Sequence, residues 1–109
     1  LFGKNNQQND HLTHKIARKT DTFMHIKNAP GAHIIITGSN HQKDVLEFCG
    51  QLALYLSKKI DGEVSYIPVK TIKKGPLPGQ VILRNEKTFY LRFDPQYESV
   101  FRNEIRRIK

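Results

Sequence analysis

The chain has 109 residues, of which 38% are hydrophobic and 26% charged, and it carries a formal net charge of +8. This length fits one domain, and the composition excludes a collagen, a coiled coil and a wholly disordered chain. A single cysteine excludes an internal disulfide framework. The sequence contains no run of about 18 apolar residues, so no membrane span is predicted. The chain begins with Leu1 and residues 1–10 lack the apolar stretch of a signal peptide, so we expect a domain taken from a longer protein. The excess of positive charge favours an anionic partner.

The first predicted element is a short helix from about Asp10 to Arg18. Its apolar residues recur at helical spacing. Asn9 or Asp10 can cap it, because a short side-chain oxygen accepts from the free backbone N–H groups of the first turn. Next come residues 22–28 and 32–37, rich in β-branched and aromatic side chains on either side of Ala29-Pro30-Gly31. Two strands joined by a turn are therefore predicted.

The strongest periodicity in the chain predicts a second helix from Lys43 to Lys59. Its apolar side chains recur at i, i+3, i+4 and i+7, and the pair Lys58-Lys59 would lie in the last turn, where it complements the helix dipole. The pair Asp61-Gly62 follows as a stop signal.

The rest of the chain reads mainly as strands. Residues 64–72 predict one strand, and residues 81–84 and 88–93 predict a hairpin around Asn85-Glu86-Lys87. The tail 95–109 holds apolar residues at a spacing compatible with a closing helix. Strands in adjacent pairs with two or three helices predict an α+β fold with a mixed, mostly antiparallel sheet.

Phe23, His25 and Lys27 alternate along the first long strand with Met24 and Ile26. Side chains of a strand point alternately to its two faces, so Met24 and Ile26 are predicted to face a core. The opposite face would carry an aromatic ring, an imidazole and an ammonium group, a combination that can stack on a base and meet phosphate. The alternative is a polar, solvent-facing surface on which Phe23 is covered by a helix.

The histidines and the cysteine do not form a catalytic or metal-binding pattern. His33 lies across the turn from His25, and His11 and His14 have i, i+3 spacing, but metal sites usually need three or four ligands with carboxylate or thiolate help. Cys49 lies on the apolar face of the second helix, and no nucleophile elbow or phosphate-binding loop occurs. We therefore expect no metal, no cofactor and no catalysis, and we rank a small hydrolase using His25 and His33 last.

Basic residues cluster between positions 58 and 92, where eight stand against three acidic residues. Lys73 and Lys74 precede the loop Gly75–Gly79, whose two prolines would hold the lysines in a defined place. This cluster predicts a site for a polyanion. The alternative is a solvated run of charge.

Five strings of residues follow one another along the chain: Asn9-Asp10-His-Leu12-Thr13, Asp21-x-Phe23-x-His25-x-Lys27-x-x-Pro30-Gly31-x-His33, Leu52-Ala53-x-Tyr55-x-Ser57-Lys58, Lys73-Lys74 with Pro78-Gly79-x-Val81, and Lys87-Thr88. In this order they resemble the NFACT RNA-binding domain, and the resemblance runs from about Gly3 to Asp94. Phe23 stands where that family usually has Trp, which would make a smaller stacking platform. We therefore expect a domain at residues 1–94 and a basic tail at 95–109.

The resemblance implies a non-catalytic module of ribosome-associated quality-control factors that act on stalled large ribosomal subunits in the cytoplasm. Its partners would be rRNA or tRNA and the large subunit. The expected RNA-binding residues are Phe23, His25, Lys27, His33, Lys73 and Lys74. Phe23 would stack on a base, the lysines would meet phosphate, and the histidines would donate hydrogen bonds.

The same domain also forms the C-terminal part of proteins long labelled fibronectin-binding protein A. The resemblance therefore leaves one alternative function, an adhesin domain that contacts fibronectin at the cell surface. That alternative would add a surface-associated pool of the protein. Basic surfaces also bind acidic protein surfaces.

Overall fold

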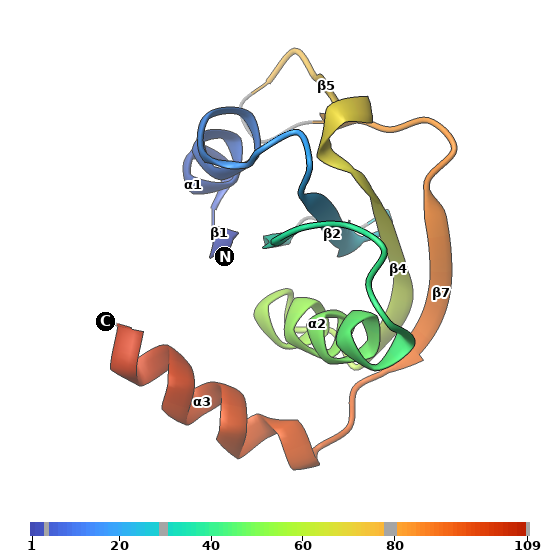
Figure 1. The fold of residues 1–109 in the computed structure, drawn as a ribbon. Helices are drawn as coiled ribbons and strands as arrows, with labels where there is room; N and C mark the ends of the chain where they lie inside the picture. The colour runs from blue at the N-terminus through green and yellow to red at the C-terminus, as the bar shows by residue number, and fades with distance from the viewer. Residues whose placement is uncertain (4, 29–30, 78–80, 109) are drawn as a thin grey trace.

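The computed structural model describes residues 1–3, 5–28, 31–77 and 81–108, with side chains as far as residue 104. A five-stranded antiparallel sheet runs through its centre (Figure 1). Across the sheet the strands are β1 (Phe2–Gly3), β3 (His33–Ile36), β2 (Thr22–Ile26), β4 (Asp61–Pro68) and β7 (Lys87–Arg92). Two short strands, β5 (Lys73–Lys74) and β6 (Val81–Ile82), form a separate pair. The predicted α+β class is confirmed.

The helical segments lie on both sides of the sheet (Figure 1). They are α1 (Asn6–His11), which continues as a π-helical turn η1 (Leu12–Ile16), α2 (Lys43–Leu56), the 3₁₀ turn η2 (Val69–Thr71) and α3 (Gln96–Ile108). Among the described residues no helix is long and apolar enough to cross a membrane.

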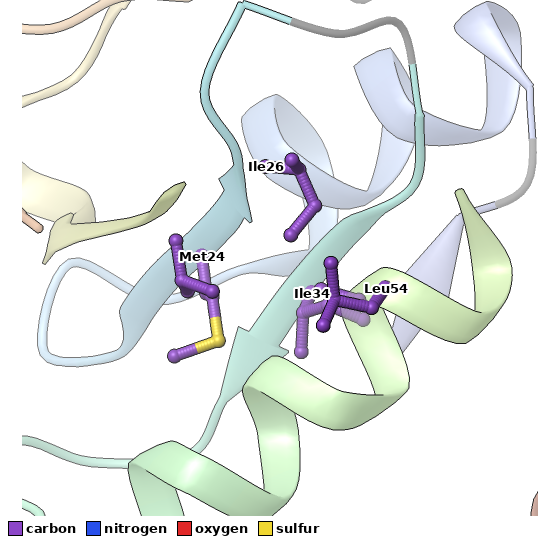
Figure 2. Packing of buried hydrophobic residues seen from close by; sticks show 6 residues of the cluster. Met24, Ile26, Ile34 and Leu54 are labelled. Carbon is purple, nitrogen blue, oxygen red and sulfur yellow. The ribbon is translucent and has the colours of Figure 1, made fainter. Parts of the chain in front are cut away.

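The alternation predicted along β2 is confirmed, because side chains on its two faces pack into two separate hydrophobic cores. Met24 and Ile26 face α2 and pack with Ile34 of β3 and Leu54 of α2 (Figure 2). Phe23 points to the opposite face and packs with residues that include Leu12 of η1. The sheet is therefore covered on both faces, and Leu12 of η1 and Val69 of η2 help to cover the face to which Phe23 points.

The first helix begins earlier than its apolar spacing indicates. Asn5 caps it, with the side-chain oxygen accepting from the backbone N–H of Gln8 at 2.8 Å. The predicted caps were wrong, because Asn9 lies inside α1 and is buried. Its amide donates to the carbonyl of Gly31 at 2.9 Å, and its oxygen accepts from the backbone N–H of His33 at 3.0 Å. Asn9 thus ties α1 to the start of β3.

Helix α2 is confirmed but ends at Leu56 rather than Lys59. Lys58 has a φ of 57°, a left-handed conformation that cannot continue a helix. At the end of the helix the backbone N–H of Lys58 donates to the carbonyl of Tyr55 at 3.2 Å, and that of Lys59 donates to the carbonyl of Leu54 at 3.0 Å. This is a Schellman motif. The pair Asp61-Gly62 begins strand β4.

The predicted hairpin of 81–84 with 88–93 was wrong. β6 pairs with β5, and β7 pairs with β4 over six residues from Asp61 to Tyr66. The physical reason is that β7 carries Phe89 and Leu91 onto the α2 core, whereas Val81 joins the Phe23 core on the other side. The strand predicted over 64–72 ends at Pro68 and continues as η2. The predicted turn at Ala29-Pro30 and the residues Pro78-Gly79 lie outside the described residues.

The closing helix compatible with the tail exists as α3. Phe101 is buried and packs against Phe48 and Tyr55 of α2, with ring centroids 5.5 Å away in each case. Helix α3 therefore packs on α2, on the side of the molecule away from α1 (Figure 1).

Candidate functional site

Asp21 and Gly38 fix the start of the candidate strand β2. The Asp21 carboxylate accepts from the backbone N–H of Arg18 at 2.9 Å and from that of Gly38 at 3.1 Å. These two bonds lower the pKa of Asp21, because they favour its charged form. The Thr22 hydroxyl adds a bond to the carbonyl of Gly38 at 2.9 Å. Since Gly38 has a φ of 85°, a conformation that suits glycine, the link between the β2 and β3 ends depends on it.

Phe23 cannot act as a stacking platform in this structure. Its side chain is fully buried, with an exposed fraction of 0%. The ring lies 5.3 Å from the ring of His25 and meets His33 edge-on at 4.8 Å. The predicted stacking role is thus corrected, because η1 covers the face to which Phe23 points. The buried Phe23 ring packs against both histidine rings and so helps to hold them in place.

His33 is also buried, so the prediction that it donates to RNA is corrected as well. Its Nδ1 lies 2.8 Å from the Thr13 hydroxyl. Burial, with a smaller contribution from His25, lowers the pKa of His33 to about 4. The ring is therefore neutral at physiological pH and joins β3 to η1.

His25 and Lys27 lie at the rim of the same face and are half-buried. Burial lowers the pKa of His25, and the nearby Glu86 carboxylate opposes that shift. The Lys27 ammonium lies 3.8 Å from the same Glu86 carboxylate. Within the described residues, Nε2 of His25 is buried and has no hydrogen-bond partner.

Lys74 reaches this region from the β5–β6 pair. Its ammonium lies 3.5 Å from the Asp10 carboxylate, which also lies 3.9 Å from Nε2 of His14. Lys73 next to it is exposed and makes no ion pair with any described residue. Of the two lysines singled out in the sequence, Lys73 therefore carries the more available charge.

Five of the six predicted site residues therefore come together: Phe23, His25, Lys27, His33 and Lys74. We call this group, with Asp10, His14 and Glu86, the histidine cluster. Sequence reasoning did not select Asp10, His14 or Glu86. The i, i+4 spacing of Asp10 and His14 on a helix was a usable signal, whereas the contact of Glu86 with Lys27 joins distant parts of the chain.

Within the described part of the chain, no three histidine, cysteine or acidic side chains are placed to hold a metal ion. Cys49 is half-buried in α2, and burial raises the pKa of its thiol. A raised pKa reduces the thiolate fraction, the nucleophilic form. The histidine cluster places the ammonium groups of Lys27 and Lys74 at the edge of a packed face. This arrangement suits the binding of an anion.

The family model for the NFACT protein RNA binding domain matches residues 1–86. The chain is 33% identical over 96 residues to the Rqc2 homolog RqcH of Bacillus subtilis, and 38% identical over 106 residues to that of Streptococcus suis. These matches cover 84% and 92% of this chain but only 17% and 19% of the relatives.

One solved structure shares the fold closely. It is the C-terminal part of the fibronectin/fibrinogen-binding protein of Streptococcus suis, FBPS. The TM-score is 0.82 at 35% identity, and the match covers 92% of this chain and 43% of that one.

Proposed function

Because the chain belongs to the NFACT protein RNA binding domain family, we propose that it is the RNA-binding module of a ribosome-associated quality-control factor. The observation that carries the proposal is the family match over residues 1–86, together with relatives named as Rqc2 homologs. The net charge of +8 supports a polyanionic partner. In this proposal the module is non-catalytic and docks on rRNA or tRNA of a stalled large ribosomal subunit in the cytoplasm.

Within this proposal the six predicted residues take two different roles. Lys27, Lys73 and Lys74 offer their ammonium groups to phosphate, with His25 at the rim beside them. Phe23 and His33 support this face from inside, since both are buried. Lys73 has the largest share of the phosphate contacts, because Asp10 and Glu86 compete for the other two ammonium groups.

The experiment is titration of labelled RNA against the chain at several salt concentrations. A labelled rRNA fragment of the large subunit and a labelled tRNA serve as probes. Phosphate contacts release counterions, so the affinity should fall steeply with salt. Absence of RNA binding at low salt by the folded chain would remove the proposal.

A second candidate function rests on the solved neighbour, which is described as a fibronectin/fibrinogen-binding protein. In a parallel experiment, the same protein sample is titrated against immobilised fibronectin. Fibronectin binding with no RNA binding would favour the adhesin function. RNA binding with no fibronectin binding would favour the quality-control module.

A further inference from the structure

Two adjoining cavities open at one end of the central sheet. They enclose about 510 and 450 Å³, which lies within the size range of small-molecule pockets. His41, Leu46 and Tyr66 line both cavities, which are here called together the Tyr66 groove. None of the residues of the histidine cluster lines it.

Tyr66 stands at the centre of this groove on strand β4. It lies opposite Met24 of β2 and Lys87 of β7 in the register of the sheet. Cross-strand partners share a face, so Tyr66 and Lys87 lie on the α2 face, opposite to His25. The Tyr66 ring is half-buried and packs edge-on against Phe89, with centroids 5.9 Å apart. A ring held in this way is a rigid surface for a flat ligand.

Polar groups surround the ring and are available to a ligand. The Tyr66 hydroxyl and the Asn85 amide make no hydrogen bonds to described residues, nor do the side chains of Ser39 and Asn40. Asn40 and Asn85 have φ values of 57° and 59°, so both lie in tight turns at the rim. Amide side chains of this kind read the hydrogen-bonding edges of unpaired bases.

The charges at the rim favour an anion. Lys87 is exposed and has no ion-pair partner among the described residues. Lys43 lies 3.9 Å from Glu47, the acidic residue of the groove wall, in a pair whose lysine is 90% exposed. An exposed pair of this geometry is weak, so Glu47 offsets Lys43 only in part and the rim keeps an excess of positive charge.

We propose that the Tyr66 groove binds unpaired nucleotides of single-stranded RNA. A base stacks on Tyr66, amides at the rim contact base edges, and Lys87 meets the adjoining phosphate. This inference rests on the proposed RNA-binding function and gives it a second contact surface, on the face of the sheet opposite the histidine cluster.

The test uses the absence of tryptophan from the chain. Tyr66→Trp introduces a single tryptophan at the centre of the groove, and Tyr97→Trp places one on α3 as a matched control. Oligoadenylate, which is unpaired at neutral pH, is titrated against both. Stacking should quench the fluorescence of Tyr66→Trp and leave that of Tyr97→Trp unchanged. Equal quenching in both variants, or none in either, would overturn the inference.

Affinity supplies the second measurement. Tyr66→Leu removes the stacking surface and should weaken oligoadenylate binding by roughly 5- to 150-fold, the effect of losing one base–aromatic stack, while Tyr66→Phe should retain most of the affinity. Lys87→Ala, an exposed change that spares the core, should lower the salt slope by about 0.7. Thermal melts confirm that each variant is folded.

The outcomes separate the two proposals. If rRNA or tRNA binds normally to Tyr66→Leu and Lys87→Ala, and oligoadenylate does not bind the parent chain, the groove proposal fails while the RNA-binding function stands. If neither kind of RNA binds the parent chain, the proposed function itself fails.

Discussion

The Thr13 hydroxyl lies 2.8 Å from Nδ1 of His33, and this buried contact joins η1 to strand β3. Thr13 and His33 are both almost fully buried, at 3% and 6% exposed. A protonated ring carries N–H groups on both nitrogens, so its Nδ1 could only donate to Thr13, and it would place a charge beside Phe23 and His25. Protonation of His33 would therefore bury a charge between η1 and the sheet, which is unfavourable.

We predict that acid destabilises the protein through His33. The folded pKa of about 4 lies below the ordinary value of 6.5, so the unfolded chain binds more protons between these values. The contribution of His33 to the free energy of unfolding is fully present above pH 6.5 and is lost as the pH falls toward 4. This contribution amounts to at most about 3 kcal/mol. Urea unfolding at a series of pH values measures it.

The control for this prediction is His33→Gln, which cannot titrate in this range. Its unfolding free energy should depend less on pH than that of the parent chain. Some dependence should remain, because burial also lowers the pKa of His25. Identical pH profiles for parent and variant would show that His33 is not the titrating group.

Phe23→Ala should unfold the domain more easily rather than merely weaken RNA binding. The change leaves a cavity between Leu12, Ile35 and Ile67, and truncating a buried phenylalanine costs about 3–5 kcal/mol. Tyr90→Ala is the matched control, because Tyr90 is 66% exposed and its loss should cost less than about 1 kcal/mol. Equal costs in chemical denaturation would contradict the burial of Phe23.

Lys73 and Lys74 should contribute unequally to the salt dependence of RNA binding. A single-strand phosphate contact contributes about 0.7 to the slope of log affinity against log salt. Lys73→Ala should remove close to that amount, and Lys74→Ala less, because Asp10 already holds the Lys74 ammonium at 3.5 Å. Both changes should act equally on all RNA sequences, since phosphate contacts carry no base information.

A double variant tests whether this effect is local. Lys73→Ala with Lys74→Ala should flatten the slope by about 1. Lys59→Ala with Arg102→Ala removes two exposed cations from the α2 end and α3, and should leave the slope almost unchanged. If the two double variants behave alike, only the total charge matters and the histidine cluster is not the docking face.

Lys58→Gly should stabilise the protein. Lys58 occupies the left-handed position of the Schellman motif with a φ of 57°, where glycine has no steric penalty. We expect a gain of about 1 kcal/mol, or a melting temperature about 3–6 °C higher for a domain of this size. Lys59→Gly, one residue later and outside the left-handed region, should not stabilise. A higher melting temperature for Lys59→Gly than for Lys58→Gly would contradict the assignment.

Local patterns in the sequence determined much of this fold. The period-two alternation of Met24 and Ile26 with Phe23 and His25 placed them on opposite faces, because strand geometry alone decides that. The 3.6-residue periodicity located α2, because helix geometry alone brings residues at that spacing to one face. The ordered motifs led to the family that the comparison confirmed. Helix ends were less predictable, since Asn5, rather than Asn9, caps α1.

Tertiary structure alone decided what covers each face. The period-two pattern places Phe23 and His25 on the same side of β2. Only the packed structure shows that residues of η1, η2 and the neighbouring strands bury Phe23 and leave His25 half-buried. In the same way, the pairing of β7 with β4 places Lys87 opposite Tyr66 and builds a groove that no local pattern indicates. Such contacts join segments far apart in sequence. They form because packing apolar surface on both faces of the sheet lowers the free energy of the whole chain.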